Sequence, residues 1–562
     1  MKSNNLYLTL LLLTLATTTS ASYTCISHCE RTAATSFETL SQAPSVWTRA
    51  SPPTKEETVR VLVGVRQPAS GVAALNAKFL SVSDPCHPEY KAYWSVDELV
   101  ETIGSSPADL EAVEAFLRTA GALSVETTAT RDWLEAVLPV PAAEAAFGVT
   151  LEAFEAKGIR ILRTLSPVSV PAELGPLVRV VTGLTAFPLL KPAQPKHNVA
   201  LGAPKVTPQL LWAHYNVTEP APTGTNITVA VSEFEGQRYD PIDLKKFQSD
   251  FKLLPQAVTK DNSGSGLGHT EANLDIQYIM AMAQGLDSQF WLDHSLSFNL
   301  VKWLQEIIEA GDISQVWSTS YGEAIETVSV EDAHSLDQEQ KKAASLGVSL
   351  IYASGDSGVY SRGKPQTSFY PTYPASLPSN TAVGATQMTS SGDENSAVDW
   401  SGGGFSPSSY FVGKTDAPWQ AESVAHYFAS GVTLPPSSKY DANGVGFPDM
   451  SALGVGFEVV MGLIKEPVDG TSCASPTAAG IFGLVNAHLA AANMPPLGFI
   501  NPLLYKAQAT AFRDITMGKN SDNTPYGFEA TTGWDPLSGV GVIDFPKFLE
   551  VAKNPSLVCD RN

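Results

Sequence analysis

The chain has 562 residues, which is too long for one ordinary hydrophobic core and favours two or more domains. With 43% hydrophobic, 9% aromatic and only 17% charged residues, its composition is that of a folded protein and excludes a disordered chain. The formal net charge of -21 argues against nucleic acid or an anionic membrane surface as a partner.

The first 22 residues have the three regions of a secretory signal peptide. Lys2 precedes the apolar run LYLTLLLLTLA, and the small residues TTTSAS follow it. The run is too short for a stop-transfer helix, and no later run of about 18 apolar residues predicts a membrane span. We therefore expect entry into the secretory pathway as a soluble protein. The sequons at Asn216 and Asn226 fit that route as glycan acceptors.

The 5 cysteines do not indicate a disulfide scaffold. Cys25, Cys29 and Cys86 lie in the first hundred residues, and Cys473 and Cys559 lie near the end. At most, the distal pair is expected to form one bridge, and the pattern leaves the pairing open.

Residues 23–188 form an N-terminal region of mixed α/β character. Strand-like runs at Arg60–Arg66 and Gly158–Leu165 flank a helical run at Leu110–Ala120. Residues 189–208 then bring prolines and lysines without hydrophobic periodicity, which is typical of an exposed linker that proteases cut. A simple connector between domains is the alternative interpretation of this segment.

Residues 209–562 alternate strands with helices, which predicts a doubly wound, mostly parallel sheet with its site at the carboxyl ends of the strands. Apolar runs that end in small-residue turns predict the strands, and longer periodic runs predict the helices. The expected strands are Ile227–Phe234, Gln315–Gly322 and Val348–Gly358, and the expected helices are Glu271–Gly285, Asp337–Leu346 and Ser475–Ala492.

Ser472 lies in a tight turn, GTS, before a run of small and apolar residues. A serine at the mouth of a buried helix presents its hydroxyl to a cleft, where the helix N-terminus favours negative charge. The alternative is that Ser472 simply caps the helix. The adjoining Cys473 is expected to be a packed thiol, because reactive cysteines need an electropositive setting.

His269, Glu271 and Asp275 stand together in the stretch GHTEANLDIQYIM. Residues four apart on a helix are neighbours, so Glu271 and Asp275 share one face, where two like charges weaken the helix. Two solvated carboxylates on a polar face are the alternative. A further carboxylate, Asp356, follows a strand in the turn SGDSG, where it could also cap its own backbone.

Several motifs in order resemble the sedolisins, the serine-carboxyl peptidases. The motifs are ExxxDxQ at Glu271, SGDSG around Asp356, GTSxxxP at Ser472, STSYG at Ser318, SGGGFS at Ser401, FPD at Phe447, PPLGFINPLLY at Pro495 and GWDPLSGVG at Gly533. The run FLSVSDPCHPEY at Phe79 resembles the prodomain signature of the family, so the resemblance covers nearly the whole chain.

The resemblance implies a subtilisin-like catalytic domain preceded by an α+β prodomain that inhibits it before activation. It implies that Ser472 is the nucleophile, Glu271 the general base, Asp275 the partner of Glu271, and Asp356 the donor at the oxyanion site. Glutamate titrates near about 4.3 and histidine near about 6.5, so a carboxylate is the base that still works in an acidic compartment. An aspartate donates a hydrogen bond only when protonated, which low pH supplies.

The resemblance also implies one structural Ca²⁺ ion, held by Asp514, Asp535 and the carbonyls of Ile515, Thr531 and Gly533. Oxygen ligands suit this hard cation. Glu323, which follows SYG, stands where close relatives have an aspartate that helps to recognise the substrate. The carboxylate of Glu323 could pair with a free N-terminal ammonium.

The expected function is therefore that of an acid-acting peptidase, made as a zymogen, that acts on peptides and unfolded proteins. Release of tripeptides from free N-termini is the first choice, and endopeptidase action stays open. Two competing hypotheses are a subtilisin that uses His269 and an inactive homologue that serves as a binding glycoprotein. A lysosome, a vacuole or an acidic extracellular space is the expected destination.

Overall fold

The computed structural model describes residues 35–37, 43–44, 46–156, 158–187, 204–218, 220–264, 266–294, 299–361, 364, 366–389 and 391–559. The predicted signal peptide, Cys25, Cys29 and linker residues 189–203 lie outside the described residues. In the part of the chain that is described, no helix combines the length and the apolar composition needed to cross a membrane.

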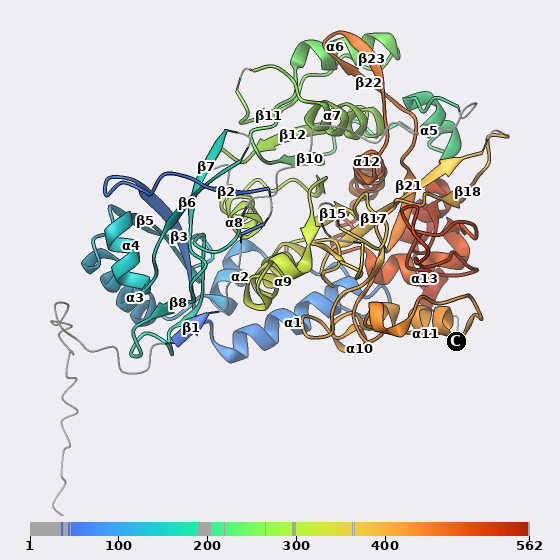
Figure 1. Ribbon diagram of the computed structural model, residues 1–562. Coiled ribbons are helices and arrows are strands. Elements are labelled where there is room, and N and C mark those ends of the chain that lie inside the picture. Colours follow the sequence, from blue (N-terminus) through green and yellow to red (C-terminus); the bar gives the residue numbers. More distant parts are fainter. Residues whose placement is uncertain are drawn as a thin grey trace, which may run out of the picture.

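A mostly parallel sheet forms the centre of the larger domain, as predicted (Figure 1). Its parallel strands are buried along nearly their whole length, which is typical of a sheet covered on both faces. In spatial order the strands are β11 (Lys260–Asp261), β12 (Asp287–Leu292), β10 (Thr228–Glu233), β13 (Val316–Thr319), β15 (Ser349–Ala353), β17 (Thr381–Met388), β21 (Met450–Leu453), β25 (Val542–Ile543) and the antiparallel β24 (Phe512–Arg513), with β18 (Glu394–Ala397) antiparallel to β17.

Helices cover both faces of this sheet, and alternate strand residues supply two separate cores. Val229 and Val231 of β10 join the core that contains α7 (Thr270–Met282) and α12 (Thr471–Ala491). Ala230, between them, joins the core that contains α8 (Leu300–Glu309) and α9 (Val330–Ser345). This alternation follows from the two-residue period of a strand.

The remaining elements of the larger domain are helices and short strands around this framework. They are α5 (Pro208–His214), α6 (Pro241–Asp250), β14 (Glu323–Ala324), η1 (Ile325–Thr327), β16 (Thr372–Tyr373), β19 (Gly404–Phe405), α10 (Gly413–Asp416), η2 (Pro418–Gln420), α11 (Ala421–Ala429), η3 (Ser437–Lys439), β20 (Gly446–Phe447), β22 (Phe457–Met461), β23 (Ile464–Val468), α13 (Asn501–Ala511), α14 (Phe545–Lys553) and α15 (Ser556–Cys559).

The N-terminal region is an α+β domain, also as predicted. Its main antiparallel sheet has the order β4-β5-β3-β9 and a core of its own, to which α3 and α4 contribute. The elements are β1 (Thr35–Phe37), β2 (Thr48–Arg49), β3 (Thr58–Val65), α1 (Ala69–Ser83), α2 (Val96–Ile103), α3 (Pro107–Thr119), β4 (Ser124–Thr127), β5 (Trp133–Pro139), α4 (Val140–Phe147), β6 (Glu152–Ala156), β7 (Ile159–Arg163), β8 (Val168–Val170) and β9 (Val178–Thr182).

A buried polar network joins the N-terminal domain to α9. The Lys342 ammonium lies 2.6 Å from carboxylate oxygens of both Asp132 and Glu339, and all three side chains are completely buried. Trp133 Nε1 donates to Glu339 Oε1 at 2.9 Å, and Arg179 Nη1 donates to Ser335 Oγ at 2.8 Å. The ion pair between Asp132 and Lys342 exists only while the two domains are in contact, whereas Glu339 and Lys342 pair within α9.

A disulfide also joins the two domains, between Cys86 and Cys559. The expectation that the distal cysteines could pair is wrong, because Cys559 bonds to Cys86 and Cys473 is a buried free thiol. The pairing depends on the position of α15 beside the loop after α1, which no local pattern indicates.

Candidate active site

Ser472 lies in the first turn of α12, which begins at Thr471 directly after Gly470. The interpretation of Ser472 as a helix cap is wrong, because Gly470 occupies the cap position. The first turn of a helix has main-chain N–H groups without helical partners, so it favours a developing negative charge. The Ser472 side chain is 6% exposed and therefore lies in a nearly enclosed position.

Close packing of α7 against α12 brings Glu271 and Asp275 toward the serine. Gly480 of α12 permits this approach, because a Cβ atom at that position would lie 2.5 Å from Met282 Cβ. Asp275 is completely buried and Glu271 is partly exposed, so the two are not a solvated pair on a polar face. Glu271 lies in the first turn of α7, where it is partly exposed, and Asp275 lies one turn further along the helix, where it is buried.

Asp356 follows β15 and is held by the residue before the serine. Asp356 Oδ1 accepts hydrogen bonds from the Thr471 N–H and the Thr471 hydroxyl, each at 2.8 Å. The Gly355 N–H in turn donates to Thr471 Oγ1 at 3.1 Å. A Cβ atom on Gly470 would lie 3.6 Å from Asp356 Oδ2 and 3.7 Å from Ser472 Cβ, so both groups border the same glycine. Asp356 therefore contacts the serine turn rather than only its own backbone.

The carboxylates converge on the residue beside Ser472. Cys473 is completely buried, as expected for a packed thiol. Burial raises its pKa well above the usual value, and the negative charges of four carboxylates raise the pKa further: Asp469, Glu271, Asp356 and Asp275. A thiol in this acidic surrounding is disfavoured as a thiolate and is unsuited to act as the nucleophile.

Asp469 and Thr471 belong to the site but were not predicted from the sequence. Asp469 is buried, and its Oδ1 accepts the Gly456 N–H at 2.7 Å. Both residues stand within three positions of Ser472, and this proximity is the signal that could have identified them.

His269 stands at the position before α7, and its side chain is exposed. Its Nδ1 accepts the Arg238 N–H at 3.1 Å, and its own main-chain N–H donates to the Arg238 carbonyl at 2.7 Å. The ring is thus engaged with the loop that precedes α6.

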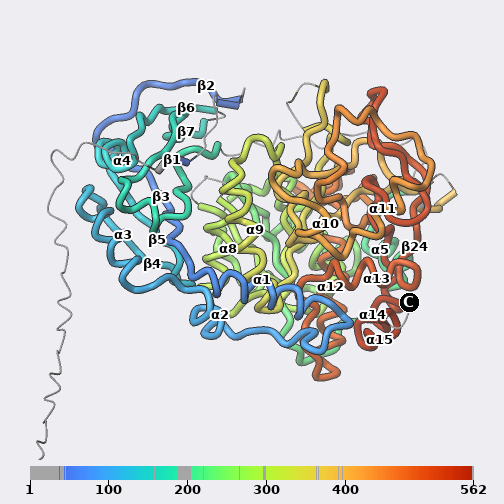
Figure 2. Tube along the Cα trace, turned by 90° about the horizontal axis from the view of Figure 1, so that it is seen from below, coloured from blue at the N-terminus to red at the C-terminus, as the bar shows by residue number. Residues whose placement is uncertain are grey.

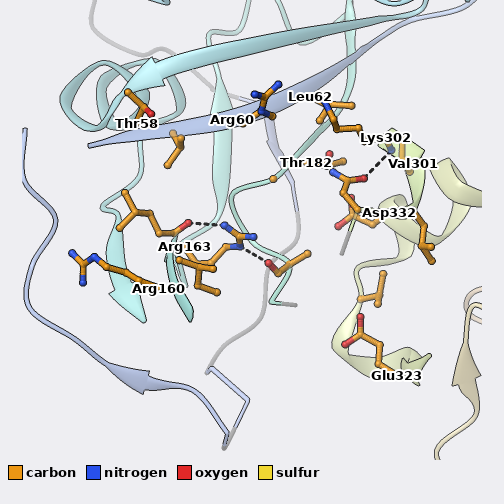
Figure 3. Close-up of a pocket in the computed structure, with 18 of the residues that line it drawn as sticks. Thr58, Arg60, Leu62, Arg160, Arg163, Thr182, Val301, Lys302, Glu323 and Asp332 are labelled. Atoms are coloured by element: carbon orange, nitrogen blue, oxygen red, sulfur yellow. Dashed lines mark hydrogen bonds between the residues drawn. The ribbon is translucent and has the colours of Figure 1, made fainter. Parts of the chain in front are cut away.

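Glu323 lies at the edge of a cavity between the two domains (Figure 3). The cavity has a volume of about 440 Å³ and is lined from one side by Arg60 and Arg163 and from the other by Glu323 and Asp332. The Thr327 hydroxyl donates to Glu323 Oε2 at 2.6 Å, but burial raises the pKa of Glu323 to about 8. Burial therefore keeps Glu323 neutral in acid in this structure.

The predicted metal ligands come together near the C-terminus. The Gly533 N–H donates to Asp514 Oδ2 at 2.8 Å, and Ser538 Oγ donates to the Ile515 carbonyl at 3.2 Å and contacts Asp535 Oδ1 at 3.0 Å. Asp514 Oδ1 is buried without a hydrogen-bond partner.

This oxygen-rich cluster fits Ca²⁺, because the buried Asp514 oxygen is available to a cation. In the described residues, no group of three or more His, Cys, Asp or Glu side chains could hold a metal. Main-chain carbonyls would therefore have to complete the ligand set beside Asp514 and Asp535.

Asn216 and Asn226, the expected glycan acceptors, are both exposed. Because both side chains are exposed on the larger domain, each could carry a glycan.

The fold and the site define a serine peptidase of the subtilase type with an N-terminal activation domain. Residues 45–187 match the family model of the pro-kumamolisin activation domain, and residues 260–527 match that of the subtilase family. The chain is 32% identical to mouse (Mus musculus) tripeptidyl-peptidase 1 over 544 residues, which cover 91% of this chain and 94% of that protein. It is 31% identical to human (Homo sapiens) tripeptidyl-peptidase 1 over 541 residues, with the same coverage of 91% and 94%.

Among solved structures, the chain is similar to Pseudomonas sedolisin, a serine-carboxyl proteinase complexed with two molecules of pseudo-iodotyrostatin. The TM-score is 0.51 at 25% identity, and the match covers 63% of this chain and 99% of that one. The chain belongs to the sedolisin family of serine peptidases, as its motifs predicted.

Proposed function

We propose that this peptidase acts in acid through a Ser472–Glu271–Asp275 triad and releases tripeptides from free N-termini. The convergence of Glu271, Asp275 and Asp356 on the Ser472 turn is the observation that carries the proposal. His269, the only histidine in the stretch that supplies the base, is engaged with the Arg238 main chain.

In this mechanism Glu271 takes the hydroxyl proton of Ser472 as the serine oxygen attacks the scissile carbonyl. Glu271 is the partly exposed member of the pair, so it can exchange its proton with the leaving amine and with water. The buried Asp275, one helical turn away, positions Glu271.

Asp356 donates a hydrogen bond to the oxyanion that this attack creates. Its Oδ1 already accepts two hydrogen bonds from Thr471, so in this proposal the proton is on Oδ2, which borders Gly470 as Ser472 does. This donation requires the neutral acid, and activity should therefore fall as the pH rises toward neutrality.

The proposed substrate is a peptide with a free N-terminus. The mammalian relatives are named tripeptidyl-peptidases, and Glu323 offers a carboxylate in a cavity that the N-terminal domain covers. Removal of that domain exposes Glu323 to water, which favours its ionised form and a pair with the substrate ammonium.

We further propose residues 1–22 as the signal peptide, 23–188 as the prodomain, 189–208 as the processed linker and 209–562 as the peptidase domain. The prodomain inhibits by covering the cavity at Glu323. Val206 is buried and pairs with Phe457, so a cut before residue 204 leaves the packed part of this segment intact. The signal peptide would direct the enzyme to an acidic destination, a lysosome, a vacuole or the cell exterior.

The principal experiment measures turnover of a tripeptidyl-amide reporter at about pH 4 by wild type, Ser472→Ala and Glu271→Gln. We expect both variants to lose at least about 10²-fold in kcat while keeping the wild-type Tm. Activity that survives in Glu271→Gln and peaks at neutral pH would instead support the histidine-dependent subtilisin, and no turnover by wild type would support the inactive homologue.

An amino-blocked version of the same reporter separates exopeptidase from endopeptidase action. We expect the blocked peptide to be cut far more slowly, because it lacks the ammonium that Glu323 binds. Equal rates for the two reporters would support an endopeptidase.

We propose one structural Ca²⁺ held by Asp514, Asp535 and the carbonyls of Ile515, Thr531 and Gly533. When bound, the ion would neutralise the carboxylates of the buried Asp535 and the partly exposed Asp514 and would fix the 531–535 loop. Chelation, and separately Asp514→Ala, should lower the Tm, and added Ca²⁺ should restore it in the chelated wild type but not in the variant. A Tm that chelation leaves unchanged would contradict this site.

A further inference from the structure

The N-terminal domain reaches the peptidase domain through two separate regions. Its sheet contacts α9 through the buried Asp132–Lys342 network. Its second contact is an arm, defined as residues 69–94, which contains α1 and extends along the peptidase domain toward the C-terminal helices (Figure 2).

Aromatic packing and main-chain hydrogen bonds fix the arm in place. Phe79 packs against Phe499 and Trp419, with ring centroids 4.9 Å and 6.0 Å away. Tyr93 Oη donates to the Pro496 carbonyl at 3.0 Å, and the Trp94 N–H donates to the Ser345 carbonyl at 2.9 Å.

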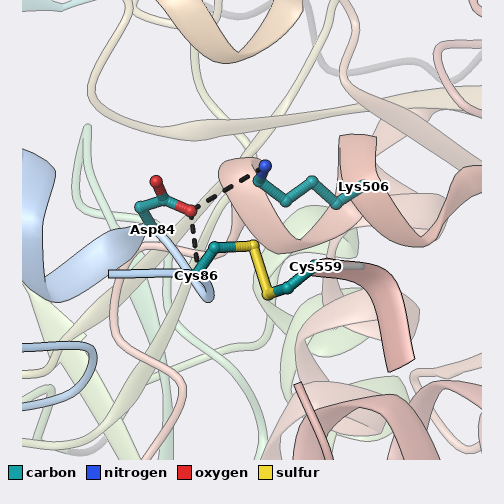
Figure 4. Close-up of a disulfide and its surroundings, with 4 residues drawn as sticks. All are labelled: Asp84, Cys86, Lys506 and Cys559. Atoms are coloured by element: carbon teal, nitrogen blue, oxygen red, sulfur yellow. Dashed lines mark hydrogen bonds and ion pairs between the residues drawn. A yellow bond between two sulfur atoms is a disulfide. The ribbon is translucent and has the colours of Figure 1, made fainter. Parts of the chain in front are cut away.

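The Cys86–Cys559 disulfide joins the loop after α1 in this arm to α15 of the peptidase domain (Figure 4). The two Cα atoms are 5.4 Å apart, although 473 positions separate them in the sequence. Asp84 supports the loop, because its Oδ1 accepts the Cys86 N–H at 3.0 Å and lies 4.0 Å from Lys506 Nζ. Cys86 is exposed and Cys559 is partly exposed, so a reductant can reach the bridge.

From this connectivity we infer that cutting the linker does not release the prodomain, and that release requires reduction of the Cys86–Cys559 disulfide. The inference rests on the proposed zymogen processing. The linker separates residue 187 from residue 204, and the bridge joins one residue on each side of it. A single cut there yields two chains that remain covalently linked.

The release step is thiol–disulfide exchange with a low-molecular-weight thiol or a protein dithiol. A reductant thiolate attacks one sulfur, breaks the S–S bond and forms a mixed disulfide while the other cysteine leaves as a thiolate. A second reductant thiol then resolves the mixed disulfide. The products are two cysteine thiols in the enzyme and one oxidised disulfide of the reductant.

The bridge also changes how inhibition depends on enzyme concentration. A tethered domain has an effective concentration of the order of millimolar, whatever the dilution. An untethered prodomain leaves as the enzyme is diluted. The oxidised two-chain enzyme should therefore keep the same specific activity over a dilution series until a reductant is added.

The test of the bridge uses the full-length Ser472→Ala precursor with a site-specific protease sequence inserted in the linker. After the cut, we expect one band of precursor size on a non-reducing denaturing gel and two bands after reduction. Cys86→Ser and Cys559→Ser should each give two bands without reductant. Two bands from the unmutated cysteines without reductant would overturn the inference. Because an added protease cuts an inactive enzyme, this outcome is independent of whether the proposed catalytic mechanism holds.

Peptide mapping tests the bridge without any cysteine variant, so it holds even if the variants fail to fold. A dilution series tests the effect of the bridge on activity. Peptide mapping of the non-reduced precursor should recover Cys86 linked to Cys559, and a bridge from Cys86 to any other cysteine would overturn the inference. Over a 100-fold dilution, specific activity should rise for active Cys86→Ser and stay constant for oxidised wild type. An equal rise in specific activity in both enzymes would also contradict the inference. Adding the reductant to Cys86→Ser is the control for effects on other cysteines.

Discussion

At the scale of single residues, the proposed mechanism depends on the protonation of Asp356, which is partly exposed. In the proposed mechanism Asp356 needs a proton to donate to an oxyanion, and the two hydrogen bonds from Thr471 to Oδ1 leave Oδ2 to carry that proton. Burial also raises the pKa of Asp332 to about 6 and of Asp449 to about 7. These two acids are therefore protonated in the folded protein at low pH, where burial of the neutral form costs least.

Asparagine at position 356 tests the role of the neutral acid. Asparagine can accept from Thr471 through its oxygen and donate from its nitrogen without titrating. Asp356→Ala should lose about 10²–10³-fold in kcat, whereas Asp356→Asn should keep more activity and lose less of it between pH 4 and about 7. The pH dependence of kcat for both variants checks this, and identical pH profiles for wild type and Asp356→Asn would contradict it.

The raised pKa of Asp449 predicts how the stability of the protein changes with pH. It is buried, and it accepts the Ala382 N–H at 2.8 Å and the Tyr505 hydroxyl at 3.1 Å. Its pKa is about 7 in the fold and near about 3.9 in an unfolded chain, so its stabilising contribution is full below about 3.9 and is lost as the pH rises through about 7.

Asp449→Asn should therefore weaken the fall in Tm between pH 5 and 8, because the amide does not titrate. The contribution of Asp449 to the free energy of unfolding is of the order of a few kcal/mol. Thermal unfolding across this range measures it, with the exposed Asp312→Asn as the control. Parallel Tm curves for wild type and Asp449→Asn would exclude this explanation.

At the scale of elements, the distance between α7 and α12 determines the geometry of the site. Gly480 is the contact point, where a Cβ atom would lie 2.5 Å from Met282 Cβ and 3.0 Å from the Ile279 carbonyl oxygen. Neither of these atoms is the end of a flexible side chain, so the helices must move apart to accept a larger residue.

Gly480→Ala should destabilise the peptidase domain by about 1–3 kcal/mol and lower kcat by up to about 10²-fold, because α7 carries the proposed base Glu271. Tm and kcat are measured together on the purified enzyme. Ala491→Gly, at the exposed end of α12, is the control that weakens the helix without this clash. A normal kcat in Gly480→Ala would show that the spacing of the helices is less critical than we propose.

The sequence could predict the elements whose pattern is local, such as β10, β13, β15 and α7. It placed the start of α9 at Asp337, but the helix begins at Val330, because its first turns are polar and begin at the capping residue Ser329. The serine, the two α7 carboxylates and Asp356 carried recognisable motifs. The Cys86–Cys559 pair could not be predicted, because it depends on a contact between segments 473 residues apart, whereas Asp469 was missed although it stands three positions before Ser472.

At the scale of the whole molecule, buried charges hold the precursor together. Lys342→Met would leave the Asp132 and Glu339 carboxylates buried without their cation, at a cost of about 3–5 kcal/mol. The Tm of the Ser472→Ala precursor should fall accordingly, and Lys245→Met, at an exposed position of α6, is the control. In the enzyme without its prodomain the same substitution should have little effect on the Tm, and an equal loss there would assign Lys342 to the peptidase domain alone.

The polar contact at α9 also affects the tendency of the enzyme to self-associate after the prodomain has left. When the prodomain leaves, α9 presents Glu339, Lys342 and Ser335 to water, and these groups are readily hydrated. An apolar surface of similar extent would promote self-association in a crowded, protein-rich compartment. This polar part of the interface can therefore open without promoting aggregation, whereas departure of the arm uncovers the apolar rings of Phe499 and Trp419.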